Sequence, residues 1–144
     1  MPDSPGDTDR PLKVLHVDDD PMNLRVVQEI LGAFGHKAVM ACSGQEALER
    51  LALEAFDIML LDIHMPGMTG VEVIERLRAS NGPERNIPVI ALTADVYSRR
   101  PAEYVALGFT DFVSKPILVS GLMATIKRCT AAPLAAEVLD RRVG

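Results

Sequence analysis

The stretch of sequence that decides the fold reads Asp57-Ile58-Met59-Leu60-Leu61-Asp62-Ile63-His64-Met65-Pro66-Gly67-Met68-Thr69-Gly70. Four apolar residues run into the carboxylate of Asp62, and a turn rich in Pro and Gly follows. A short apolar run bounded by turn residues is typical of a strand buried on both faces, as in a parallel sheet. Asp62 then lies at the carboxyl end of that strand, where open α/β sheets bind their ligands.

The composition limits the class of protein. A chain of 144 residues suits one domain with its own core, and 48% hydrophobic against 4% aromatic residues makes that core aliphatic. The net charge of −5 is unlike the basic footprint of a nucleic-acid-binding domain. The apolar runs are too short to span a bilayer, and the polar N-terminus lacks a signal-peptide core. We expect one acidic, soluble, cytoplasmic domain that binds neither nucleic acid nor membrane.

Strand and helix patterns alternate along the chain. The strand patterns cover residues 12–17, 37–42, 57–61, 87–92 and 111–114. The helical patterns cover residues 21–34, the segment after Ser43, and residues 71–79, 101–107 and 119–129. Five strands alternating with five helices predict an α/β fold, in which a parallel sheet is covered on both faces to form a doubly wound three-layer sandwich.

The two ends of the chain differ from this regular part. Residues 1–10 are rich in Pro, Gly and acidic side chains, which predicts a disordered N-terminal tail. The ordered domain is then expected over 11–129. Residues 130–144 form a C-terminal tail, in which 133–142 has the composition for one short extra helix that packs weakly.

Several polar residues mark helix starts. Asp20 is the expected N-cap of the first helix. Ser43 caps the second, and Glu46 three residues later completes the pattern of a capping box. Leu53 is a candidate for the apolar side of that second helix.

Pro101 interrupts the region after the fourth strand, because a proline breaks a helix that is already under way. We therefore expect an irregular or mobile segment over 94–101, with a loop or single turn at 95–100. A short helix over 101–107 follows and ends at Gly108.

The two cysteines, Cys42 and Cys129, lie far apart in sequence and lack the spacing of metal ligands. A disulfide between them is one alternative. Two reduced thiols packed in a cytosolic protein are the favoured interpretation.

Polar side chains end four of the five predicted strands. They are Asp18 and Asp19, Asp62, Thr93, and Lys115. Because the carboxyl ends of parallel strands share one edge of the sheet, these groups can converge. Three carboxylates gathered there need a cation, and carboxylates with water and phosphate suit Mg²⁺. A hydroxyl and an ammonium bind phosphate oxygens, so Asp62 is a candidate acceptor of a phosphoryl group.

Each of these residues also has a purely structural interpretation. The acidic run after the first strand can cap a helix and complement its dipole. Asp62 can be a turn residue, Thr93 a strand-end residue and Lys115 a solvated side chain. Each of these signals is weak when taken singly. Together, the carboxylate, hydroxyl and ammonium groups at the ends of four predicted strands favour a functional site.

At this point the sequence resembles the receiver domains of two-component response regulators over about residues 11–128. The resemblance is carried by Val17-Asp18-Asp19, Leu61-Asp62-Ile63-His64-Met65-Pro66-Gly67-Met68-Thr69-Gly70, Ala91-Leu92-Thr93-Ala94 and Phe112-Val113-Ser114-Lys115-Pro116. It implies a flavodoxin-like fold with strand order 2-1-3-4-5. It also implies that Asp62 takes a phosphoryl group from a histidine kinase or a histidine phosphotransfer protein.

The same resemblance implies a Mg²⁺ site. Asp19 and Asp62 would bind the ion directly, together with the backbone carbonyl of His64, and Asp18 would assist through water. His64 and Asp95 stand at positions that vary in the family, where they are expected to tune dephosphorylation. A role for the His64 ring as metal ligand or phosphohistidine is disfavoured.

The remaining roles implied by the family concern the phosphoryl group. Thr93 and Lys115 would contact its oxygens, and Phe112 would be the aromatic side chain that rotates as Thr93 moves. The bond between Lys115 and Pro116 is expected to be cis, which costs little before proline.

The leading functional prediction is a stand-alone receiver, a monomer or weak dimer, that switches contacts with a downstream protein or relays phosphoryl groups. A receiver excised from a hybrid histidine kinase is the alternative. A pure interaction module of the same fold is disfavoured by the intact set of site residues. An aspartate-nucleophile phosphatase would need a carboxylate at the position of His64. A flavodoxin would need a phosphate-binding loop where Asp18 and Asp19 stand.

Overall fold

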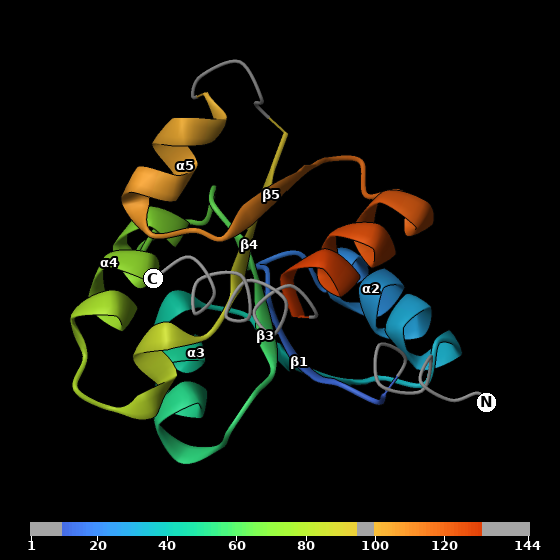
Figure 1. Ribbon diagram of the computed structural model, residues 1–144, viewed down its shortest axis with the longest axis horizontal. Coiled ribbons are helices and arrows are strands. Elements are labelled where there is room, and N and C mark those ends of the chain that lie inside the picture. Colours follow the sequence, from blue (N-terminus) through green and yellow to red (C-terminus); the bar gives the residue numbers. More distant parts are fainter. Residues whose placement is uncertain (1–9, 95–99, 131–144) are drawn as a thin grey trace, which may run out of the picture.

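The computed structural model describes residues 10–94 and 100–130. The five strands of the described chain are β1 (Lys13–Val17), β2 (Lys37–Ala41), β3 (Ile58–Asp62), β4 (Val89–Thr93) and β5 (Asp111–Ser114). Its helices are α2 (Pro21–Ala33), α3 (Gly44–Leu53), α4 (Gly70–Ala79), the 3₁₀ turn η1 (Pro83–Asn86), α5 (Pro101–Leu107) and a helix over 119–130. The predicted alternation of strands and helices is confirmed (Figure 1).

The sheet has the strand order β2-β1-β3-β4-β5, and each neighbouring pair is parallel. This confirms the flavodoxin-like order implied by the family resemblance. Asp62 is in register with Leu92, and Thr93 with Ser114. The strand ends that carry the predicted site residues therefore share one edge of the sheet.

Helices cover both faces of the sheet (Figure 1). On one face, α3, α4 and α5 pack on alternate strand residues such as Leu15 and Leu61. On the other face, α2 and the helix over 119–130 pack on the intervening residues, such as Val14 and Leu60. Burial on both faces explains why β3 and β4 are buried at every position.

In the described ranges, no helix combines the length and the hydropathy that a membrane crossing needs. The ends of the chain, 1–9 and 131–144, lie outside those ranges. The domain boundaries, the tails and the cytoplasmic location stay predictions.

The helix starts agree with the sequence in part. Asp20 accepts a hydrogen bond from the backbone N–H of Met22 at 2.9 Å, so the predicted N-cap of α2 is confirmed. Ser43 caps α3 as expected. The predicted capping box at α3 is wrong in its second half, because the Glu46 carboxylate accepts from the N–H of Cys42 at 2.9 Å.

The Pro101 region is confirmed where the structure describes it. Pro101 occupies the first turn of α5, where its missing N–H costs no hydrogen bond. Gly108 ends the helix with φ of +114°. The expected loop at 95–99 lies outside the described residues.

Two predicted packing residues lie at the surface. Leu53, at the end of α3, is 82% exposed, so it does not belong to the apolar side of the helix. Both cysteines are free thiols, but only Cys129 is buried. The predicted packing role of Cys42 is therefore wrong: Cys42 follows the buried part of β2, and its thiol donates to Glu46 at 3.2 Å.

Gly70 gives a direct test of how the fold positions the site. A Cβ at Gly70 would lie 2.6 Å from the backbone oxygen of Asp62 and 2.6 Å from the Cα of Ile63. We expect Gly70→Ala to lower the free energy of unfolding by about 1–3 kcal/mol, because backbone atoms must shift to accommodate the methyl group. Urea unfolding followed by circular dichroism measures the change.

The matched control is Gly32→Ala in α2, where no atom lies within 4 Å of the added Cβ. This variant should gain about 0.5–1 kcal/mol, since alanine favours the helix. Equal stability of the two variants would contradict the close approach of Gly70 to β3.

The cysteines should differ in reactivity. Burial raises the pKa of the Cys129 thiol to about 11, whereas the exposed Cys42 has its pKa raised chiefly by the hydrogen bond to Glu46. At pH 8 the thiolate fraction of Cys129 is about one in a thousand. We expect iodoacetamide to modify Cys42 first and Cys129 only with partial unfolding or at higher pH, as measured by peptide mass mapping. Equal rates at pH 8 would contradict this difference.

Candidate functional site

Three carboxylates and one ammonium meet at the carboxyl edge of the sheet. Carboxylate oxygens of Asp18, Asp19 and Asp62 lie within 4.8 Å of one another. The Nζ of Lys115 lies 3.3 Å from Oδ2 of Asp62 and 3.6 Å from Oδ2 of Asp18. The structure thus brings together four of the predicted site residues, from the ends of β1, β3 and β5.

Asp18 is fully buried and its oxygens are already engaged. Its Oδ1 accepts the backbone N–H of Asp20 at 2.9 Å, and its Oδ2 accepts the side-chain amide of Asn23 at 3.3 Å. Asp19, in contrast, is exposed. The two neighbouring carboxylates therefore differ: one is held by the protein, and the other faces the solvent.

Asp62 is 3% exposed, and its Oδ1 accepts the backbone N–H of His64 at 3.2 Å. Burial is the main reason that the pKa of this carboxyl is raised, and the charge of Asp18 adds to it. The charge of Lys115 and the hydrogen bond from His64 act in the opposite direction. Burial and the charge of Asp18 thus disfavour the ionised form of Asp62, and a bound cation would favour it.

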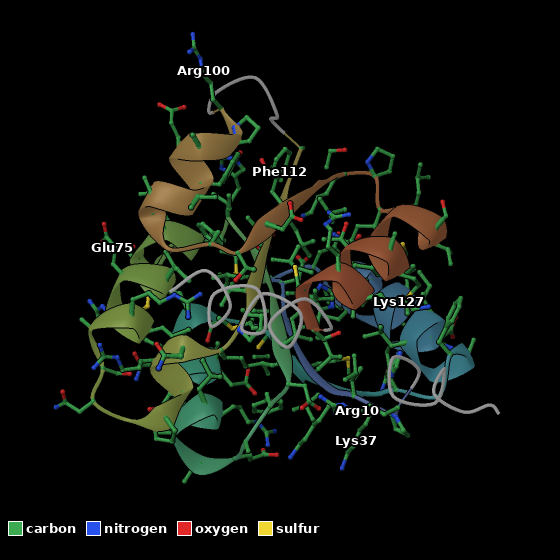
Figure 2. The ribbon with its side chains drawn as sticks, viewed as in Figure 1. Arg10, Lys37, Glu75, Arg100, Phe112 and Lys127 are labelled. Atoms are coloured by element: carbon green, nitrogen blue, oxygen red, sulfur yellow. The ribbon has the colours of Figure 1, made fainter. Side chains whose placement is uncertain are left out.

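Thr93 and Phe112 lie beside this cluster. Thr93 is buried at the end of β4, the strand next to Asp62, and it is in register with Ser114 of β5. Phe112 is half-buried on β5 (Figure 2), and its ring stacks on Tyr104 of α5. The peptide bond between Lys115 and Pro116 is cis, as expected.

Sequence reasoning missed His16. This residue of β1 is fully buried, and within the described parts of the chain neither ring nitrogen has a hydrogen-bond partner. Its Nε2 lies 3.9 Å from Oδ2 of Asp18. Burial lowers the pKa of His16 to about 4 despite the opposing effect of Asp18, and Lys115 lowers it further. The available signal was a histidine between the apolar residues Leu15 and Val17 of the strand pattern 12–17.

Asn23 was missed as well. It lies one turn into α2, half-buried, and donates to Asp18. A polar residue five positions after an aspartate gives no sequence signal by itself. The contact arises because α2 starts directly beside the carboxyl end of β1.

Exposed apolar side chains occur in the two segments that follow the acidic residues at the end of β1 and Lys115 of the site. They are Met22 and Val26 of α2 with Leu118 and Val119, which follow β5; these side chains are 73%, 46%, 67% and 45% exposed. One of these residues, Val26, also lines a hollow of about 220 Å³ together with Lys115 and Pro116. We call these four residues the α2 apolar surface.

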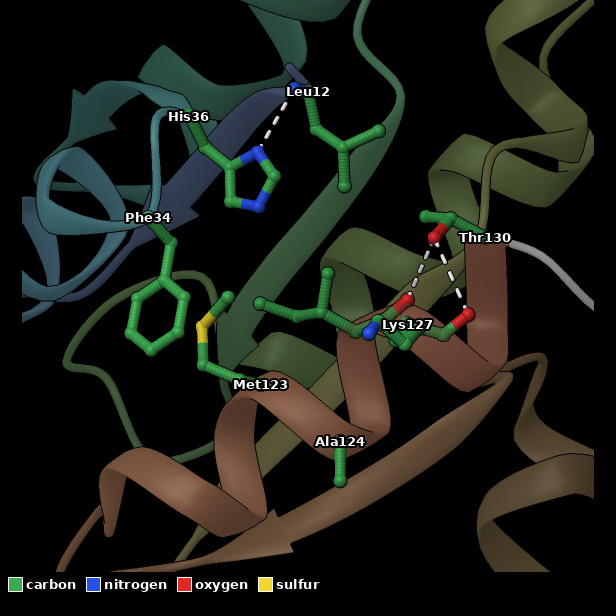
Figure 3. A pocket seen from close by; sticks show the side chains of 8 residues that line it. Leu12, Phe34, His36, Met123, Ala124, Lys127 and Thr130 are labelled. Carbon is green, nitrogen blue, oxygen red and sulfur yellow. Dashed lines mark hydrogen bonds between the residues drawn. The ribbon is translucent and has the colours of Figure 1, made fainter. Parts of the chain in front are cut away.

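A larger cavity, of about 540 Å³, lies far from the acidic cluster. Figure 3 shows Leu12, Phe34, His36 and Met123 around it. Leu12 precedes β1, so the cavity opens at the amino edge of the sheet, and His36 accepts the backbone N–H of Leu12 there at 3.0 Å. It brings together no carboxylates from strand ends and is separate from the candidate site.

Comparison with known proteins agrees with this geometry. The sequence model of the response regulator receiver domain matches residues 14–127. The chemotaxis protein CheY4 of Vibrio cholerae has a similar structure, with a TM-score of 0.76 and 30% identity over 83% of this chain and 98% of that chain. The receiver domain of the sensor histidine kinase PA1611 of Pseudomonas aeruginosa PAO1, solved with a magnesium ion in its active-site cleft, has a TM-score of 0.76 and 25% identity over 84% of this chain and 98% of that chain.

Curated relatives are larger sensor proteins. The sensor protein GacS of Pseudomonas syringae pv. syringae is 35% identical over 90% of this chain. The aerobic respiration control sensor protein ArcB of Escherichia coli K12 is 37% identical over 81% of it. The chain spans about 15% of the length of each of these two proteins.

The buried His16 leads to a prediction about pH. Because its pKa is lowered from 6.5 to about 4, the unfolded state binds more protons between these values, and stability falls as the pH drops through that range. Between pH 7 and pH 5 we expect His16→Leu to remove about 2 kcal/mol of this acid-dependent loss. The measurement is urea unfolding in EDTA at pH 7 and pH 5.

The exposed Val26 on α2 supplies the control for this experiment, since Val26→Leu replaces one apolar side chain by another and should lose as much stability as the wild type. If wild type and His16→Leu lose equal stability between pH 7 and pH 5, His16 is not the group responsible.

Proposed function

The chain belongs to the response regulator receiver domain family, and on this premise we propose that Asp62 accepts a phosphoryl group from the phosphohistidine of a histidine kinase or histidine phosphotransfer protein. The observation that carries the proposal is the buried Asp62 carboxylate at the end of β3, with Lys115 at 3.3 Å and two further carboxylates close by. A carboxylate without these neighbours would be a structural residue.

The donor set fits Mg²⁺, a hard cation that prefers carboxylate, carbonyl and water oxygens. We propose that Asp19, Asp62 and the backbone carbonyl of His64 hold the ion, and that Asp18 acts through water. The exposure of Asp19 supports this assignment, as do the existing bonds of Asp18 to Asp20 and Asn23. When bound, the ion neutralises charge on the transferring phosphoryl group.

The chemical step is an in-line displacement at phosphorus. A carboxylate oxygen of Asp62 forms the new P–O bond while the P–N bond of the donor breaks. The electron pair of that bond goes to the imidazole nitrogen, and the histidine leaves neutral when its other ring nitrogen carries a proton. Lys115 and Thr93 contact the phosphoryl oxygens and stabilise their charge.

The ammonium of Lys115 is already close to the reacting carboxylate. Its ion pairs with Asp18 and Asp62 hold the ammonium beside the carboxylate to which the negatively charged phosphoryl group would be transferred. This preorganisation supports a role in transfer, because a charge that is fixed in advance needs no reorganisation during the reaction.

The donor histidine must reach Asp62 from the open edge of the sheet. Met22 and Val26 stand in the first two turns of α2, which starts just after Asp18 and Asp19, and Leu118 and Val119 follow Lys115 within four residues. Exposed apolar side chains rimmed by charged ones mark protein contacts. We therefore propose that the phosphohistidine-bearing partner docks on Met22, Val26, Leu118 and Val119.

The proposal covers the acceptor domain and not the protein around it. Similar structures include CheY4, of which the match covers 98%, while GacS is matched over 15% of its length. A stand-alone receiver and a receiver within a hybrid kinase share the same acceptor chemistry. The downstream target and the oligomeric state stay predictions.

The test is phosphorylation by a small donor. We expect incubation with Mg²⁺ and phosphoramidate, whose P–N bond resembles that of phosphohistidine, to add one phosphoryl group by intact mass. Asp62→Asn should add none, and EDTA should prevent the reaction in the wild type. Lys115→Met should slow it by about a hundredfold or more, since one charged contact to the transferring group is lost.

Glu75→Gln, which neutralises an exposed carboxylate on α4, is the matched control and should react like the wild type. No increment on the wild-type protein, or an equal increment on Asp62→Asn, would falsify the acceptor assignment.

A further inference from the structure

An aromatic cluster joins β5 to α5. The rings of Phe112 and Tyr104 are stacked, with centroids 5.0 Å apart and planes inclined by 18°. Phe109 contacts Tyr104 edge-on, with centroids 6.2 Å apart and planes at 74°. Aromatics make up 4% of the chain, so this contact of three rings concentrates a scarce residue type next to Thr93 and β4.

Tyr104 is the fixed member of the stacked pair. It is 1% exposed, and the helix that carries it is held by Gly108 at its C-terminal end and by the edge-on contact with Phe109. Phe112 is only half-buried. If one ring of the pair turns, it is Phe112.

Phe112 is also connected to the acceptor site. Its register partner is Ala91, and the register partner of Ser114 is Thr93. Side chains two residues apart on a strand point to the same face. Phe112 and Thr93 therefore face the same side of the sheet, the side that α5 covers.

We propose that Tyr104 is a positioning residue that holds Phe112 in the stacked orientation and thereby opposes phosphorylation of Asp62. The inference rests on the proposed function, in which Phe112 rotates as Thr93 moves to the phosphoryl group. The stack exists in the arrangement where Asp62 is paired with Lys115 and accepts from His64. Rotation of Phe112 toward Thr93 breaks it, so part of the stacking energy is lost in the phosphorylated arrangement.

The size of the effect follows from the energy of such pairs. Aromatic stacking beyond simple burial corresponds to about a twofold to tenfold change in an equilibrium constant. If the stack stabilises only one of the two orientations of Phe112, it shifts their populations by at most this twofold to tenfold factor. Removing the Tyr104 ring should therefore raise the phosphorylation rate of Asp62 about twofold to tenfold.

The experiment compares variants of the aromatic cluster. Tyr104→Leu removes the stacked ring but keeps apolar volume, and Tyr104→Phe keeps the ring while removing the hydroxyl. Phe109→Leu is the matched control, because it removes a ring that contacts Tyr104 but has no ring contact with Phe112 within the described chain. Each protein is phosphorylated with acetyl phosphate at saturating Mg²⁺, and the rate is followed by intact mass.

The decisive experiment is a double-mutant cycle, in which the effect of Tyr104→Leu on the phosphorylation rate is measured with Phe112 and with Phe112→Leu. If stacking is the cause, Tyr104→Leu accelerates phosphorylation in the wild-type background and has no effect when Phe112 is leucine. NMR spectra of labelled phenylalanine should also show the Phe112 ring signals shifted in Tyr104→Leu but not in Phe109→Leu. A purely structural role of Tyr104 would lower stability in both backgrounds and leave the rate ratio at one.

The expected order of rates is Tyr104→Leu above wild type, with Phe109→Leu equal to wild type and Tyr104→Phe, which keeps the stacked ring, below Tyr104→Leu. A rate for Tyr104→Leu at or below wild type, or the same acceleration in the Phe112→Leu background, overturns the proposal. Should Tyr104→Leu fail to fold, Tyr104→Met serves in the same cycle. If wild type takes no phosphoryl group at Asp62, the proposed function itself fails, which is a distinct outcome.

Discussion

The site depends on one electrostatic constraint: two buried carboxylates share a single lysine. Asp18 and Asp62 come from different strands, and Lys115 lies 3.6 Å and 3.3 Å from them. Their mutual repulsion raises the cost of keeping both ionised, and one positive charge compensates only part of it. The fold accepts this cost at the carboxyl edge of a sheet whose buried positions are mostly apolar. Such a local conflict is typical of functional sites in otherwise consistent sequences.

The fold was largely predictable because its signals are local or repeat regularly. Apolar runs in β3 and β4 and the glycine at position 108 correspond to the strands and the helix end that the structure shows. The strand order came from the family resemblance and not from the patterns themselves. The capping box at Glu46 failed because the preceding N–H of Cys42 competes for the same carboxylate, a choice that depends on the turn geometry.

The strand-end residues of the candidate site were predictable for a topological reason, since parallel strands bring their carboxyl ends together. The supporting residues were not. His16 lies inside β1, two residues before Asp18, and Asn23 lies on α2, where it reaches Asp18 only because α2 starts beside the end of β1. Tyr104 has no motif of its own, and its stack on Phe112 is a contact between a helix and a strand that spacing cannot foretell.

Arg78, on α4, connects several segments of the chain near the C-terminal end of α5. Its half-buried guanidinium donates to the carbonyl of Gly108 at 2.9 and 2.7 Å and to the carbonyls of Arg85 and Ile87 at 2.7 Å. The C-terminal end of α5 is therefore fastened to α4 and to the start of β4. A single guanidinium thus joins three segments of the chain through their carbonyl oxygens, so the end of α5, the turn η1 and the residue before Pro88 are held together by one side chain.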